Sequence, residues 1–272
     1  MDNKEEILVD AQDIINSIVN DYYTAGIKAE VLIDMLLTPV LTRILNDCKK
    51  VAGKWEFITK EFPVLKNENG DFRNYNADYL ICNDERIYLI ELKTNTSSED
   101  KKQIARYLKL LKQCDGKSFN ETLGQDFCKL LSHIYKTEIA DIAHMQDGIK
   151  KILGNNNSDS INTDKAIEYL KRKAVTGSGK YLFQAGQIID AKPDSWLDKT
   201  VGLIYIVPSR SSFENLLVKV AGEAKYEYNE KDIIVVGFKE DILPVLDKEA
   251  KKNKYMEMVY ITINELFGDN NA

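Results

Sequence analysis

The chain has 272 residues, of which 44% are hydrophobic and 29% are charged, so it can bury a sizeable core and is not expected to be disordered as a whole. Its net charge of −6 argues against a passive, high-affinity DNA-binding protein, because such affinity rests on neutralising phosphates. No apolar run approaches the roughly 18 residues that span a bilayer, and the acidic N-terminus lacks a signal-peptide pattern. We therefore expect a cytoplasmic protein without a membrane contact. The four cysteines are scattered without a Cys-x-x-Cys pair, which indicates reduced, buried thiols rather than a zinc site or a disulfide framework.

The N-terminal part of the chain predicts two helices followed by a strand. Glu5–Tyr23 carries apolar residues at helical spacing, and Ile27–Lys50 is a second amphipathic pattern that Pro39 is expected to bend or restart. Trp55–Thr59 alternates as a strand, and Glu61–Leu65 continues it to a bulge or a sheet edge. The turn-rich segment 67–71 ends this part.

A β-hairpin is predicted next. Two apolar runs, Tyr79–Cys82 and Ile87–Leu92, flank the polar pair Asp84-Glu85, which has the length of a tight turn. A two-residue turn fixes which residues lie opposite each other: Cys82 with Ile87, Leu80 with Leu89, and Asp78 with Glu91. Because side chains alternate along a strand, Asp78, Leu80, Leu89, Glu91 and Lys93 are expected on one face.

Two carboxylates directly opposite each other are unfavourable in a sheet. The Cβ atoms of Asp78 and Glu91 would lie roughly 5 Å apart, and like charges at that position are destabilising. A divalent cation between them removes the repulsion, because hard cations bind carboxylate oxygens. The register therefore predicts a Mg²⁺ or Mn²⁺ site.

A helix is predicted after the hairpin. Ser97-Ser98 followed by Glu99-Asp100 is typical of a helix start with acidic residues in the first turn. Gln103 and Tyr107 are four residues apart and so share one face. A separate apolar face, expected to pack on the sheet, is formed by Ile104, Leu108 and Leu111.

Together these residues resemble the PD-(D/E)xK nuclease superfamily. Asp78 matches the family's Asp, Glu91-Leu92-Lys93 matches the (D/E)xK triplet, and Gln103-x-x-x-Tyr107 resembles the motif of the RecB-like branch. Ala77 stands where the family pattern has Pro, a position that varies within the family. The resemblance covers roughly residues 55–113, and it implies a restriction-endonuclease-like αβββαβ core with a mixed sheet.

The resemblance also implies a role for each residue. Asp78 and Glu91 would hold one or two Mg²⁺ (or Mn²⁺) ions, with the Leu92 carbonyl as a further ligand. Lys93 would orient or deprotonate the attacking water, or stabilise the developing charge. Gln103 and Tyr107 would bind backbone phosphate or orient the lysine and the metal-bound water. Glu30, on the preceding helix, suits an additional ligand, although an ordinary surface glutamate is the interpretation we favour.

The rest of the chain predicts an α/β domain with a helical insertion near residues 115–195. Helical patterns cover Phe119–Leu153 and Asp164–Ala174, and three apolar runs then predict strands that extend the sheet in parallel: Val201–Pro208, Asp232–Phe238 and Met258–Ile263. We expect one domain over residues 1–272, and a separate helical subdomain is the alternative.

Two basic clusters could meet a phosphate backbone. The first lies on the helix that carries Gln103, and the second lies on the predicted insertion. The first cluster is the better candidate for the wall of a groove that binds the phosphate backbone. For the second cluster we favour an ordinary solvated surface. Their members are Lys101, Lys102, Arg106, Lys109 and Lys112 in the first, and Lys165, Lys171, Arg172 and Lys173 in the second.

The sequence as a whole favours a divalent-metal-dependent nuclease, acting on DNA rather than RNA. The alternative from another class is a catalytically inactive nuclease-fold module that binds nucleic acid or a protein partner. A further alternative is a hydrolase that acts only within a larger complex.

Overall fold

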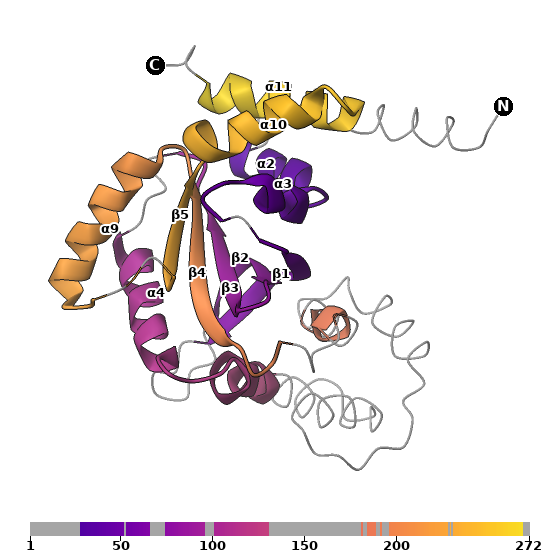
Figure 1. The fold of residues 1–272 in the computed structure, drawn as a ribbon. Coiled ribbons are helices and arrows are strands. Elements are labelled where there is room, and N and C mark those ends of the chain that lie inside the picture. Colours follow the sequence, from indigo (N-terminus) through magenta and orange to yellow (C-terminus); the bar gives the residue numbers. More distant parts are fainter. Residues whose placement is uncertain are drawn as a thin grey trace, which may run out of the picture.

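The computed structural model describes residues 28–51, 53–65, 74–95, 101–130, 181, 184–188, 191, 196–227, 229 and 231–268. This part of the chain forms an α/β fold around a five-stranded mixed sheet of order β1-β2-β3-β4-β5 (Figure 1). The strands are β1 (Glu56–Leu65), β2 (Asn74–Cys82), β3 (Arg86–Leu92), β4 (Thr200–Val207) and β5 (Ile233–Gly237). The first three pair antiparallel, whereas β4 and β5 run parallel to β3.

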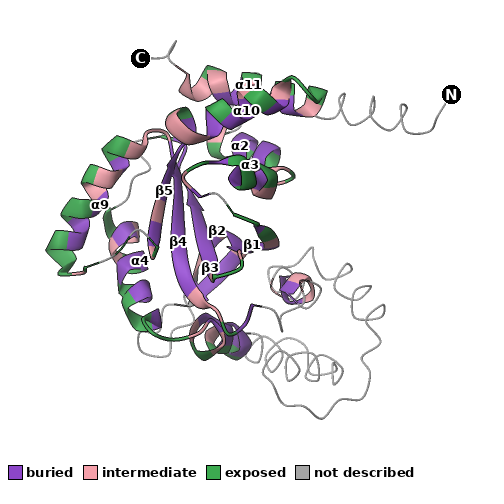
Figure 2. Cartoon of the chain, in the orientation of Figure 1, coloured by how far each residue is buried: buried purple, intermediate pink, exposed green. Residues whose placement is uncertain are grey.

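Helices cover both faces of the sheet. One face packs against α4 (Lys101–Cys114) and α9 (Arg210–Ala224), and the other against α2 (Ala29–Leu37), α3 (Leu41–Asp47), α10 (Leu243–Ala250) and α11 (Lys254–Phe267). The described part also contains two short π-helical segments, Asn120–Gly124 and Phe238–Ile242. Figure 2 shows the strands buried along most of their length. Burial on both faces explains why β4 is almost entirely apolar from Val201 to Val207 rather than alternating.

The hairpin has the predicted register. Cys82 pairs with Ile87 and Leu80 pairs with Leu89. Asp84 and Glu85 form the turn, which is closed by a 2.9 Å hydrogen bond from Asn83 N to Arg86 O. The Asn83 side chain also accepts from the N–H groups of Glu85 and Arg86, at 2.9 and 2.8 Å. Asparagine thus stabilises the turn by a local side-chain bond.

The predicted break at Pro39 is confirmed. Helix α2 ends at Leu37 and α3 begins at Leu41, so the two are separate elements. Thr38 terminates α2 with its hydroxyl, which donates to the carbonyl oxygen of Asp34 at 2.6 Å. Strands β4 and β5 also lie where predicted and pair in parallel.

The predicted strand at Met258–Ile263 is wrong, because this segment lies within α11. The buried residues Met256, Val259 and Ile263 are three and four apart, which is the spacing of one helix face. Asn253 caps the helix by accepting from the N–H groups of Tyr255 and Met256, at 2.7 and 3.4 Å. Helical packing and this cap override the strand propensity of the β-branched residues.

The helical character predicted for the insertion is confirmed only in part. Residues 120–130 and 184–188 are helical. The predictions for Glu5–Tyr23, Asp164–Ala174, the turn at 67–71, the helix start at 97–100 and the second basic cluster lie outside the described residues. Among the described helices, none has both the length and the apolarity to cross a membrane.

Gly202 provides a test of the packing between β3 and β4. A Cβ at this position would lie 2.5 Å from the Tyr88 ring, which is held in turn by an edge contact with Trp55. We expect Gly202→Ala to lower the free energy of unfolding by about 1–3 kcal/mol, because the buried ring has to shift. Urea denaturation of the variant measures this.

Gly222→Ala is the matched control. Gly222 lies on α9, and a Cβ there meets nothing within 4 Å. Alanine in a helix is favoured over glycine by roughly 0.5–1 kcal/mol, so this variant is expected to gain stability. Equal effects of the two substitutions would contradict the packing described here.

Candidate functional site

Glu91 and Lys93 lie at the end of β3, inside the protein. Glu91 is 4% exposed and Lys93 is 7% exposed. The backbone of this segment is fixed by the parallel ladder to β4, where Glu91 pairs with Tyr205 and Lys93 N donates to Ile206 O at 2.7 Å. Two buried charges on a central strand are costly unless they are paired.

Three donors converge on the Glu91 carboxylate. Lys93 Nζ donates to Oε1 at 2.6 Å, Gln103 Nε2 donates to Oε1 at 2.5 Å, and Tyr107 Oη donates to Oε2 at 2.7 Å. Gln103 and Tyr107 therefore point the same way from α4, as their spacing predicts. Ile104, Leu108 and Leu111 are buried against the sheet, also as predicted.

Asp78 reaches the same end of β3 by a different route. The paired residues of β2 and β3 end at Tyr79 and Ile90, and beyond them Asp78 Oδ2 accepts from Leu92 N at 2.6 Å. The aspartate side chain thus binds the backbone of β3 where the regular ladder stops. It brings the second carboxylate to the Glu91 segment, although the predicted pairing of Asp78 with Glu91 is not among the observed β2–β3 pairs.

The predicted alternation of side chains does not continue through Asp78. Leu80 and Ala77 both belong to the core on the α4 side, although they are three residues apart. On the neighbouring strand β1, Glu61 has a positive φ of 52°, a conformation that is uncommon for a residue with a side chain. The sheet is therefore distorted on both strands at the level of Asp78.

Burial and the neighbouring Glu91 charge raise the pKa of Asp78 to about 7. The Leu92 N–H and the Lys93 ammonium act in the opposite direction but do not compensate. Glu30 adds the smallest of these contributions, again raising the pKa. The exposed Glu30 is close enough to affect Asp78 electrostatically, in keeping with the favoured interpretation of a surface glutamate.

The donor atoms at this site fit a hard divalent cation. Carboxylate oxygens are ligands that Mg²⁺ and Mn²⁺ prefer, and a cation would offset the repulsion that raises the pKa of Asp78. No group of three or more His, Cys, Asp or Glu side chains placed to hold a metal occurs in the described part of the chain. Asp78 and Glu91 would thus need backbone oxygens or water to complete the coordination. The Leu92 carbonyl remains a predicted ligand.

Tyr205 is a neighbour of the site that the sequence did not reveal. It lies beside Glu91 on β4 and is completely buried, with its ring 6.1 Å from that of Tyr107 in an edge contact. Burial, and after it the Glu91 charge, raises the pKa of Tyr205 well above its usual range. The signal in the sequence is one hydroxyl within the otherwise apolar run Val201–Val207.

Basic residues lie on the outer surface of α4. Lys101, Lys102, Arg106, Lys109 and Lys112 are all exposed. Arg106, which directly precedes Tyr107, has a charge that lowers the pKa of Tyr75 against the larger effect of burial.

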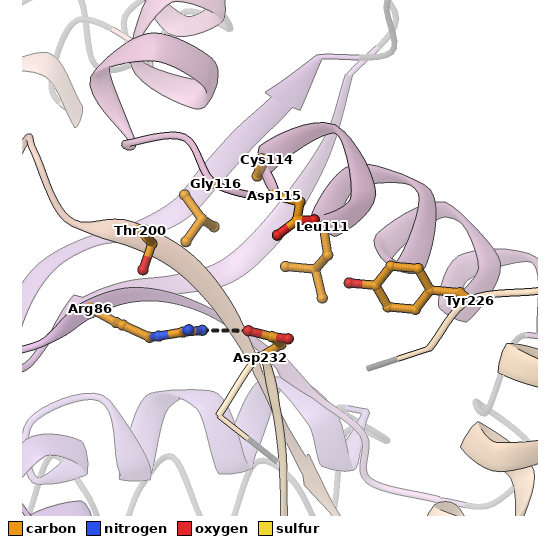
Figure 3. Close-up of a pocket in the computed structure, with 9 residues that line it drawn as sticks. Arg86, Leu111, Cys114, Asp115, Gly116, Thr200, Tyr226 and Asp232 are labelled. Atoms are coloured by element: carbon orange, nitrogen blue, oxygen red, sulfur yellow. Dashed lines mark hydrogen bonds and ion pairs between the residues drawn. The ribbon is translucent and has the colours of Figure 1, made fainter. Parts of the chain in front are cut away.

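A small pocket lies at the opposite end of α4 and β3 (Figure 3). Its walls include Arg86, Cys114, Tyr226 and Asp232, and they contain neither Asp78 nor Glu91. Two of the charged residues there are paired with each other, since Arg86 Nη1 donates to Asp232 Oδ1 at 2.6 Å. All four cysteines of the chain, Cys114 among them, are buried free thiols, as predicted.

Comparison with known proteins adds no further assignment. A scan against protein-family models, a search of curated proteins and a search of solved structures each found no significant match.

Asp78 makes the stability of the metal-free protein depend on pH. In the unfolded chain this carboxyl ionises near its ordinary pKa of 3.8, whereas in the folded protein it retains its proton until about pH 7. The folded state therefore binds more protons in this window, and its stability falls as the pH rises. Asp78→Asn removes the titration and keeps an acceptor for Leu92 N.

We expect Asp78→Asn to have a higher free energy of unfolding than the wild type in EDTA. The difference between the two proteins should grow from pH 4 to pH 7 and stay constant above pH 7. The full difference should be roughly a few kcal/mol. Urea unfolding of both proteins at each pH measures it, and other titrating groups cancel in the comparison. A difference that is independent of pH would show that Asp78 ionises normally in the folded state.

Proposed function

We propose that this chain is a divalent-metal-dependent nuclease of the PD-(D/E)xK type, which hydrolyses phosphodiester bonds in DNA rather than RNA. The observation that carries the proposal is the buried carboxylate of Glu91, which is bound by Lys93, Gln103 and Tyr107. Asp78 lies near it, and its pKa is raised. Every residue of the sequence resemblance takes part in this cluster.

The order of elements supports the proposal. Helices α2 and α3 precede three antiparallel strands, α4 follows them, and β4 returns parallel to β3. This is the αβββαβ order that the resemblance implies. Strand β5 and the helices α9, α10 and α11 extend it.

Each residue has a chemical role in this proposal. A bound divalent cation would lower the pKa of a coordinated water and withdraw charge from the phosphoryl group. Asp78 and Glu91 would bind the cation. Lys93, held by Glu91, would orient or deprotonate the attacking water or stabilise charge on the phosphate. Gln103 and Tyr107 hold Glu91 in position, and the basic residues of α4 would bind the backbone of the nucleic acid.

A second candidate function is a nuclease-fold module that binds a partner without turnover. One observation favours it: Lys93, Gln103 and Tyr107 already occupy both oxygens of Glu91. In such a module the cluster would be a structural centre that needs no cation. Metal binding separates the two candidates.

Cleavage of DNA is the direct test. With Mg²⁺ or Mn²⁺ present, the wild type is expected to cleave linear or circular DNA, and Lys93→Ala is expected to lose at least about a hundredfold in rate, since one preorganised charged donor contributes on that order. Gel assays on both DNA forms, with RNA in parallel, measure the rate and the substrate preference.

Lys199→Ala is the control for loss of a lysine. Lys199 Nζ donates to the Asn83 carbonyl at 2.7 Å, at the turn end of the hairpin away from Glu91. Its removal should leave cleavage unchanged. Full cleavage by Lys93→Ala, or no metal-dependent cleavage of any nucleic acid by the wild type, would contradict the proposed nuclease.

Binding of Mn²⁺ is the second test. We expect the wild type to bind Mn²⁺ at pH 8, and Asp78→Asn to bind at least about tenfold more weakly because a charged oxygen ligand is lost. Isothermal titration calorimetry measures the affinity. Asp232→Asn serves as the control, since Asp232 is ion-paired with Arg86 at the far end of β3. Equal affinity in Asp78→Asn and the wild type would place the cation elsewhere.

A further inference from the structure

Tyr205 is held by the sheet and by two helices. Its backbone pairs with that of Glu91. Its ring makes an edge contact with Tyr107 on α4, and the ring centroid lies 4.6 Å from that of Phe213 on α9. The side chain is thus fixed between the sheet and two helices, on the same face as the Glu91 carboxylate.

The Tyr205 hydroxyl is unlike those of the other buried tyrosines. Tyr79 Oη donates to Asp34 at 2.5 Å, Tyr88 Oη donates to the Lys231 carbonyl at 3.1 Å, and Tyr107 Oη donates to Glu91. Tyr205 Oη is buried and has no hydrogen-bond partner among the described residues. An unsatisfied buried hydroxyl is unfavourable, and phenylalanine would pack equally well against Tyr107 and Phe213. The presence of the hydroxyl is therefore explained by a hydrogen bond that it makes in another state of the site.

The Glu91 carboxylate is the acceptor that we consider for the Tyr205 hydroxyl. Its Oε1 atom accepts from both Lys93 and Gln103, and its Oε2 atom accepts from Tyr107. A cation at this carboxylate would compete with these donors for the oxygen lone pairs. A carboxylate ligand is normally held by hydrogen bonds from residues that do not touch the metal. Tyr205 is adjacent in register to Glu91 and has a donor to give.

We propose that Tyr205 is a positioning residue of the cation site, whose hydroxyl donates to the Glu91 carboxylate when that carboxylate binds a divalent cation. The inference rests on the cation site of the proposed function and adds a residue from β4 to it. Tyr205 acts through Glu91 and does not itself bind the metal.

Tyr205→Phe tests the inference, because it removes the hydroxyl and keeps the ring. In EDTA the variant should be as stable as the wild type or more stable, since an unsatisfied polar group is lost. Its affinity for Mn²⁺ should fall about ten- to a hundredfold, as is usual when a ligand loses its supporting hydrogen bond. Urea denaturation in EDTA and calorimetric titration with Mn²⁺ measure the two quantities.

Tyr88→Phe is the matched control. Its hydroxyl is bonded to the Lys231 carbonyl, and its side chain belongs to the core on the opposite face of the sheet. This variant should lose stability in EDTA and keep the wild-type affinity for Mn²⁺. In Tyr205→Phe we expect the opposite pattern, unchanged or higher stability in EDTA together with weaker binding of Mn²⁺. Loss of a purely structural hydroxyl cannot produce that pattern.

Two outcomes would overturn the inference alone. One is wild-type affinity for Mn²⁺ in Tyr205→Phe, and the other is a large loss of its stability in EDTA, which would reveal a structural bond. An absence of Mn²⁺ binding in the wild type would overturn the proposed function as well, so the two failures are distinguishable.

Discussion

A carboxylate buried in the middle of the sheet dictates the arrangement around it. Glu91 is charged, almost fully buried and on a central strand, so its oxygens need partners from within the protein. One comes from its own strand, as Lys93, and two come from α4, as Gln103 and Tyr107. Helix α4 is thus attached to the sheet by two different forces, apolar packing along Ile104, Leu108 and Leu111 and polar bonds to Glu91. The polar bonds fix which face of the helix turns inward.

Asp78 makes a structural hydrogen bond, from Leu92 N, in surroundings that are otherwise unfavourable for a carboxylate. Its position costs a regular β-pairing, coincides with a strained Glu61 on β1, and places a second carboxyl beside Glu91. Unfavourable features of this kind persist when the surrounding structure enforces them, and they concentrate at functional sites. In the proposed function, a divalent cation would offset the repulsion between the two carboxylates. That is why the proposed function depends on Asp78 together with Glu91, rather than on the Glu91–Lys93 pair alone.

Patterns that lie close together along the chain could be predicted from the sequence, and relations between distant segments could not. The register of Leu80 with Leu89 follows from a two-residue turn, and the joint orientation of Gln103 and Tyr107 follows from their spacing. The strand predicted at Met258–Ile263 is wrong because its β-branched residues have the composition of a strand, whereas the Asn253 cap and the spacing from Met256 are those of a helix. The place of Tyr205 beside Glu91 depends on a parallel pairing with a distant strand, and no local pattern encodes that register.

The position of β4 also bears on the order in which the protein folds. Asp78, Glu91, Gln103 and Tyr107 all belong to one continuous stretch, whereas β3 and β4 are neighbours separated by roughly a hundred residues, whose closure costs about 4 kcal/mol of chain entropy. The hairpin and α4 can therefore assemble early, while contacts of high sequence separation form slowly. Until β4 arrives, the Glu91 carboxylate is flanked on one side by water. The pairing of β4 with β3 thus converts a hydrated carboxylate into a buried one.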